Sequence, residues 1–70
     1  MMANNEKIEE IYNSYINGQL KQMVSEIKEY ELSTGNSFWE GLDSLIREWN
    51  PILKYRTLLD IISYYTKYGE

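Results

Sequence analysis

Residues 51–68 read PILKYRTLLDIISYYTKY, and this stretch decides how the remainder of the chain can be arranged. On a helix with about 100° per residue, its apolar side chains fall on two arcs. The broader arc consists of Ile52, Tyr55, Leu58, Leu59, Ile62 and Tyr65. The second arc lies roughly opposite and consists of Leu53, Ile61, Tyr64 and Tyr68. A helix that is apolar on most sides is either enclosed by its own chain or pressed against a partner.

Upstream of this stretch, the spacing of apolar residues predicts two helices over roughly 5–17 and 19–31. The first has a cap at Asn4 or Asn5, and its apolar stripe consists of Ile8, Ile11, Tyr12 and Tyr15. The stripe of the second consists of Leu20, Met23, Val24, Ile27 and Tyr30. Asn17-Gly18 ends the first helix, because glycine is the usual left-handed residue after a helix. A connection this short predicts an angular or antiparallel helix pair.

A third helix is predicted over roughly 38–49, after a loop at residues 32–36 that is rich in turn-forming residues. Ser37 and Glu40 form a capping box at its start, and Asp43 and Arg47 are spaced to form an ion pair on its outer side. Its buried face carries Phe38, Leu42, Leu45 and Trp49, widened by Trp39 and Ile46. Gly41 weakens this helix by roughly 1 kcal/mol relative to alanine, and it either allows another helix to approach closely or is incidental.

The fourth helix, roughly 51–68, begins at Asn50-Pro51, because asparagine suits the capping position and proline suits the first helical one. The adjacent apolar pairs Leu58-Leu59 and Ile61-Ile62 are typical of a helix and do not fit the alternation of a strand. The sequence thus predicts one all-α domain over residues 1–70, a small bundle of about four helices. The fourth, as the most apolar, is expected at its centre.

The composition limits the possible functions. The chain has 70 residues, 43% of them hydrophobic, with seven tyrosines and neither cysteine nor histidine. Disulfides are therefore excluded, and the common zinc ligands, the usual general base and the thiol nucleophile are missing. Six serines lie outside any nucleophile-elbow motif, and no EF-hand loop is present. We expect no enzyme activity, no cofactor and no metal site.

The charge pattern argues against nucleic acid and membranes. The net charge is −4, and no cluster of lysine and arginine is available for phosphates. The Asn17-Gly18 turn invites comparison with helix-turn-helix proteins, but the helix that follows it is acidic. No apolar run approaches the roughly 20 residues of a membrane span, and the start of the chain does not resemble a signal peptide. The expected location is the cytoplasm.

Residues 15–30, YINGQLKQMVSEIKEY, resemble stretches of small uncharacterised helical proteins of bacteriophages and bacterial mobile elements. The resemblance covers about the first half of the chain and is carried by an Asn-Gly turn before an amphipathic helix. That family has no established activity, so the resemblance implies no functional residue. It implies a small accessory protein of a phage or its host.

Binding to a protein partner remains as the favoured function. Tyrosine is enriched at interfaces because it covers area at low entropic cost. The candidate contact is the second arc, Leu53, Ile61, Tyr64 and Tyr68, and a homodimer is the simplest partner. Two alternatives stay open. The other helices can enclose this arc, or the protein can act as an acidic mimic of nucleic acid, presenting Glu6, Glu9, Glu10, Glu26, Glu29 and Glu31 to a basic groove.

Overall fold

The computed structural model describes the backbone of residues 2–69 and the side chains of residues 6–69. Within this part of the chain the regular structure consists of four helices: α1 (Met2–Ile16), α2 (Leu20–Thr34), α3 (Phe38–Leu45) and α4 (Pro51–Tyr68). The predicted all-α fold with four helices is therefore confirmed. The predicted cap at Asn4 or Asn5 is wrong, because α1 begins at Met2 and both residues lie inside it; their side chains lie outside the described residues. None of the helices over residues 2–69 is long and apolar enough to cross a membrane.

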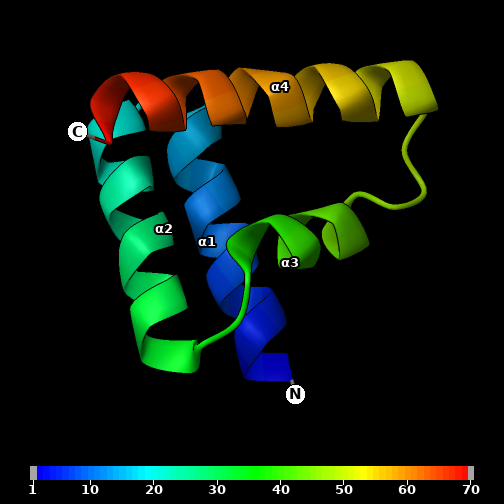
Figure 1. Ribbon diagram of the computed structural model, residues 1–70. Coiled ribbons are helices and arrows are strands. Elements are labelled where there is room, and N and C mark those ends of the chain that lie inside the picture. The colour runs from blue at the N-terminus through cyan, green and yellow to red at the C-terminus, as the bar shows by residue number, and fades with distance from the viewer. Residues whose placement is uncertain (1, 70) are drawn as a thin grey trace.

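Helices α1 and α2 form an antiparallel hairpin, and α4 crosses one end of that hairpin (Figure 1). The tight turn between α1 and α2 depends on Gly18, whose φ of +78° is strained for a residue with a side chain. Helix α3 lies beside the hairpin, and an extended connection leads from it to the start of α4 (Figure 1). Helix α4 thus crosses the hairpin at a steep angle, whereas α1 and α2 run alongside each other (Figure 1).

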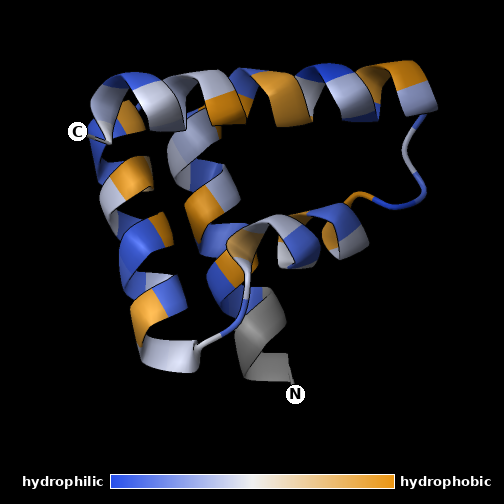
Figure 2. Ribbon diagram, in the orientation of Figure 1, coloured by the Kyte–Doolittle hydropathy of each residue, from blue (hydrophilic) through white to orange (hydrophobic). Residues whose placement is uncertain are grey.

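The core lies where the inner faces of the four helices meet. Figure 2 shows the hydrophobic segments of α1 and α2 alternating with hydrophilic ones along each helix. The buried hydrophobic residues are Ile8, Ile11, Met23, Val24, Ile27, Tyr30, Phe38, Leu42, Ile46 and Ile61. Helix α2 packs against each of the other three and supplies four of these residues. The expectation that the fourth helix is central is therefore wrong, since α2 holds that position.

Two helix ends differ from the prediction. Helix α2 continues through residues 32–34, which were expected to form a loop, and ends at Gly35 in the left-handed conformation (φ +73°). Helix α3 ends at Leu45, four residues early, and the chain passes through turns that include a hydrogen bond from Trp49 N to Ile46 O at 3.0 Å. Because the residue before a proline avoids helical geometry, Asn50 cannot be helical, but this constraint does not require α3 to end as early as Leu45.

The junction between α3 and α4 is fixed by two polar interactions. The Asn50 side chain accepts hydrogen bonds from Ile52 N at 2.9 Å and Leu53 N at 3.4 Å, which confirms the predicted cap. Asp43 pairs with Lys54 of α4 at 2.9 Å, and the predicted pair with Arg47 is replaced. Because α3 ends before Arg47, that residue is no longer one helical turn from Asp43.

The close approach of α3 to α1 depends on Gly41. A Cβ atom at this position would lie 2.7 Å from Ile8 Cδ1 and 3.1 Å from Ile8 Cγ1. Such distances are too short for carbon atoms in contact. The prediction that this glycine permits another helix to come near is confirmed.

Candidate interaction surface

The most unusual surface of the molecule is the side of α4 that faces away from the other helices. Four large apolar residues are exposed there: Ile52 (79%), Tyr55 (65%), Leu59 (48%) and Ile62 (43%). Their spacing of three, four and three residues places them within about 80° of one another on the helix. We call these four residues the outer stripe.

The outer stripe is large for a chain of this size. An aromatic or long aliphatic residue presents about 200 Å² when fully exposed, so residues exposed by 43–79% together present on the order of 500 Å². The largest apolar patch on a typical monomer covers roughly 300–600 Å² and often serves a function. A stripe of this size on a single helix is therefore a candidate docking surface.

The opposite face of α4 packs on the hairpin. Ile61 is fully buried, Thr57 is 8% exposed, and Tyr64 and Tyr68 are half-buried. Leu53 is 50% exposed and lies at the edge of this face. Of the four residues predicted to contact a partner, Ile61 is thus inaccessible, and Tyr64 and Tyr68 are largely occupied within the chain. The described helices thus bury Ile61 and cover most of Tyr64 and Tyr68, whereas Leu53 stays exposed. The exposed stripe comes from the broader arc.

Aromatic contacts explain why this face turns inward. The ring of Tyr64 lies 6.4 Å from the ring of Tyr15 on α1 and 6.4 Å from that of Tyr68. On the other flank of α4, Tyr65 meets Trp39 of α3 edge-on at 5.5 Å. Tilted and edge-to-face contacts of this kind add about 0.5–1.5 kcal/mol each beyond the area they bury. Rings on both flanks therefore hold α4 in one rotational setting.

A hydrogen bond reinforces the same setting. The Tyr15 hydroxyl donates to Asp60 Oδ2 at 2.6 Å and so connects α1 with α4. Burial, followed by this hydrogen bond and the negative charge of Asp60, raises the pKa of Tyr15 well above its ordinary value. The hydrogen bond therefore ties α1 to α4 beside the contact between Tyr15 and Tyr64.

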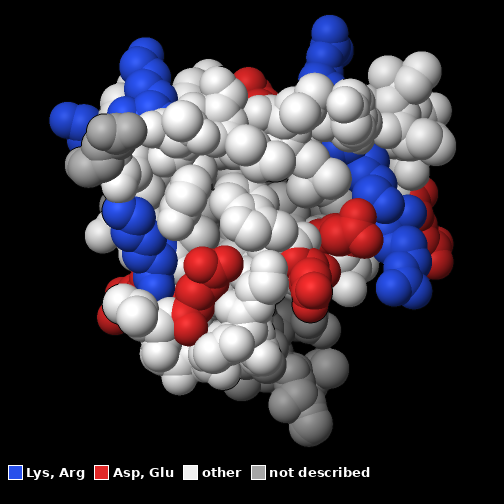
Figure 3. Space-filling model, in the orientation of Figure 1, with Lys and Arg blue, Asp and Glu red and all other residues white. Residues whose placement is uncertain are grey.

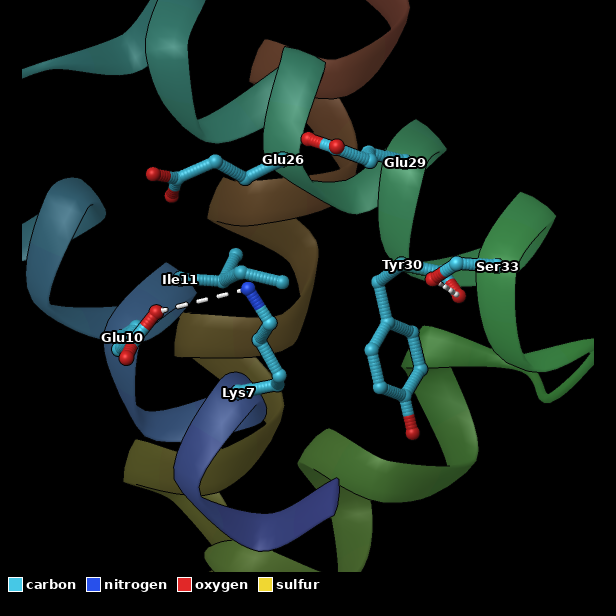
Figure 4. Close-up of a pocket in the computed structure, with 7 residues that line it drawn as sticks. All are labelled: Lys7, Glu10, Ile11, Glu26, Glu29, Tyr30 and Ser33. Atoms are coloured by element: carbon cyan, nitrogen blue, oxygen red, sulfur yellow. Dashed lines mark hydrogen bonds and ion pairs between the residues drawn. The ribbon is translucent and has the colours of Figure 1, made fainter. Parts of the chain in front are cut away.

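The most defined cleft lies between α1 and α2 and is small. Its volume is about 130 Å³, and it is lined by Lys7, Glu10, Ile11, Glu26, Glu29, Tyr30 and Ser33 (Figure 4). Lys7 Nζ lies 3.9 Å from Glu10 Oε1 (Figure 4), so the ammonium is directed at a carboxylate of its own chain. Ligand pockets usually exceed about 300 Å³. A hollow of about 370 Å³ beside Tyr15, Asp60 and Tyr64 is larger but more open to solvent. Among the described residues, no group of three or more acidic side chains converges on a common point that could hold a metal ion.

The six glutamates proposed for an acidic mimic do not form one free surface. Glu26 accepts hydrogen bonds from Ser14 Oγ at 2.9 Å and Gln22 Nε2 at 3.0 Å. The Glu31 carboxylate accepts from Phe38 N at 2.9 Å and so holds the start of α3. Figure 3 shows acidic and basic side chains interspersed around a broad uncharged area on the face that it displays.

The outer stripe was not predicted from the sequence, because the arc with more apolar residues was expected to be the buried one. The buried face contains Thr57 and the aliphatic part of Lys54, neither of which counts as apolar. One feature of the sequence does indicate the stripe. Its spacing is that of the a and d positions of a coiled coil over two heptads.

Comparisons of the chain with protein families, curated proteins and solved structures find no match. The geometry of the outer stripe therefore carries the functional inference.

Proposed function

We propose that the protein is a non-catalytic interaction module that docks a protein through the outer stripe of α4. The single observation that carries this proposal is the exposure of Ile52, Tyr55, Leu59 and Ile62 along one side of a helix whose other side is packed. Leaving such a patch in water is unfavourable by roughly 25 cal/mol per Å² relative to covering it. A partner that covers the stripe therefore gains free energy without rearranging the core.

Chemical considerations support a binding role over catalysis. The chain has no histidine or cysteine. The absence of cysteine also favours the cytoplasm as its location, because small secreted domains commonly depend on disulfides. The resemblance of residues 15–30 adds the context of a small accessory protein of a phage or its host.

The acidic-mimic alternative has less support. A mimic of nucleic acid needs carboxylates that are free and spaced along one surface, whereas Glu26 and Glu31 are bonded within the chain. Strong dependence of partner binding on salt would favour the mimic. Docking through the outer stripe is expected to vary little with salt, because its contacts are apolar.

Site-specific photocrosslinking tests the proposal. A benzophenone side chain is placed at Tyr55 in the outer stripe, or at Leu32 of α2 as the matched control. Leu32 is also apolar and is 87% exposed, but it does not belong to the stripe. After irradiation in the cells that make the protein, we expect a protein adduct from position 55 and none from position 32. Equal adducts from both positions, or no adduct from position 55, would contradict docking through the stripe.

A further inference from the structure

We infer that the occupant of the outer stripe is a second copy of this chain, bound with the two α4 helices antiparallel across a two-fold axis. The inference rests on the proposed function and adds the identity of the partner. It follows from the symmetry of the stripe, its area and its position at the edge of the molecule.

The stripe is complementary to itself. A two-fold contact requires that when residue i meets residue j of the second copy, residue j also meets residue i. The spacing of three, four and three residues reads the same in both directions, with its midpoint at position 57. Antiparallel pairing about that midpoint sets Ile52 against Ile62 of the second copy and Tyr55 against Leu59. All four exposed residues thereby find an apolar neighbour.

The charged flank of the stripe does not decide the register. Arg56 and Asp60 lie on one side of the stripe, a turn apart. In the antiparallel pair, Arg56 of one copy lies about 3 Å along the axis from both Asp60 and Arg56 of the other, so that attraction and repulsion oppose each other. Asp60 also already accepts a hydrogen bond from Tyr15 of its own chain. The apolar residues of the stripe therefore set the register.

The position of α4 leaves room for a second helix. It forms one edge of the molecule, and its start projects past the hairpin (Figure 1). No other helix of the described chain lies over the exposed side of the stripe, as the exposed fractions of its four residues require. A second copy can thus approach without any change in the fold.

The area indicates a weak dimer. Two stripes on the order of 500 Å² each bury about 1,000 Å² in total, at the lower limit for a specific contact between proteins. We therefore expect a dissociation constant in the micromolar range and exchange between monomer and dimer on dilution.

Sedimentation equilibrium over a hundredfold dilution tests this inference. The mass of the natural chain is expected to fall from near twice 8.4 kDa toward 8.4 kDa as the concentration drops. Tyr55→Glu, or Ile62→Lys as a second variant, is expected to remain monomeric with unchanged helix content. Leu32→Glu, the matched control, is expected to behave as the natural chain. A natural chain that stays monomeric, or a Tyr55→Glu chain that still dimerises, overturns the inference.

Cysteine variants test the antiparallel register, because the natural chain has no cysteine. We expect a mixture of Ile52→Cys and Ile62→Cys chains to form the mixed disulfide on mild oxidation. Ile52→Cys alone is expected to resist oxidation, since ten residues, about 15 Å, separate its two copies and a disulfide needs Cα atoms within about 7 Å. Rapid dimerisation of Ile52→Cys alone overturns the register.

Photocrosslinking at Tyr55 distinguishes a failure of the second-copy inference from a failure of the docking function itself. An adduct of twice the chain mass supports both the second copy and the docking function. An adduct with a different protein, together with a monomeric natural chain, overturns the second copy and leaves the docking function standing. The absence of any adduct overturns both.

Discussion

At the level of single residues, Ile61 and Ile52 carry the same side chain on one helix in opposite environments. Ile61 is fully buried, whereas Ile52 is 79% exposed. We expect Ile61→Ala to lower the free energy of unfolding by about 3 kcal/mol, because it leaves a cavity in the core. Ile52→Ala should change it by less than about 0.5 kcal/mol in dilute protein.

Urea unfolding of both variants measures this difference at the same low protein concentration. Since the two substitutions remove the same atoms, differences in side-chain chemistry cancel. A larger loss in Ile52→Ala than in Ile61→Ala would mean that α4 packs on its other face.

The hydrogen bond between Tyr15 and Asp60 predicts a loss of stability in alkali. Because the pKa of Tyr15 is raised above its ordinary value of 10.0, the folded protein keeps a proton that the unfolded chain releases. The stabilisation is therefore complete below about pH 10 and is lost as the pH rises further. Tyr15→Phe should cost about 1 kcal/mol at pH 7 through the lost hydrogen bond, and its stability should decline less steeply above pH 10.

Unfolding of the natural chain and of Tyr15→Phe between pH 7 and pH 11.5 provides the check. Tyr55→Phe, which alters an exposed ring, is the matched control and should follow the natural profile at neutral pH. Parallel profiles for the natural chain and Tyr15→Phe above pH 10 would show that this phenol does not carry the effect.

At the level of elements, Gly41→Ala at the contact between α1 and α3 has two opposing effects on the free energy of unfolding. Alanine in place of glycine favours the helix by about 1 kcal/mol. The added methyl group would lie 2.7 Å from Ile8 Cδ1 in the core, and overpacking of this kind costs about 1–3 kcal/mol. We expect the steric cost to prevail, so that Gly41→Ala lowers the free energy of unfolding by about 1 kcal/mol.

A double-mutant cycle with Ile8→Val isolates the steric part. Valine lacks the Cδ1 atom, so Gly41→Ala should cost less, or become stabilising, in the Ile8→Val background. Thermal or urea unfolding of the four chains gives the coupling energy. Additive effects would mean that Ile8 moves aside and that the close approach does not depend on the glycine.

The starts of α3 and α4 followed from local chemistry, whereas the predicted cap of α1 at Asn4 or Asn5 did not. Ser37 accepts a hydrogen bond from Glu40 N at 3.4 Å, and Asn50 caps α4, both at the predicted positions. The end of α3 did not follow, because apolar spacing continues to Trp49 after the backbone has left the helix. Spacing reports which residues face the core and does not distinguish a helix from a series of turns that keeps the same face inward.

At the level of the whole molecule, self-association predicts that the thermal midpoint depends on protein concentration. A dimer that forms only from folded chains stabilises them by mass action, so the midpoint should rise with concentration for the natural chain. Tyr55→Glu should show one constant midpoint. Calorimetry or circular dichroism over a hundredfold range of concentration measures both. A constant midpoint in the natural chain would contradict the second copy.

The sequence by itself determined the four helices, the caps of α3 and α4 and most of the core, because these depend on residues close together in the chain. Met23 and Phe38, for example, are buried as their spacing predicts. Only the tertiary structure decided which side of α4 is exposed. Both arcs are apolar enough to bury, and the choice is made by distant partners, Tyr15 for Tyr64 and Trp39 for Tyr65. Those contacts join residues far apart in the sequence, and the periodicity of one helix carries no information about them.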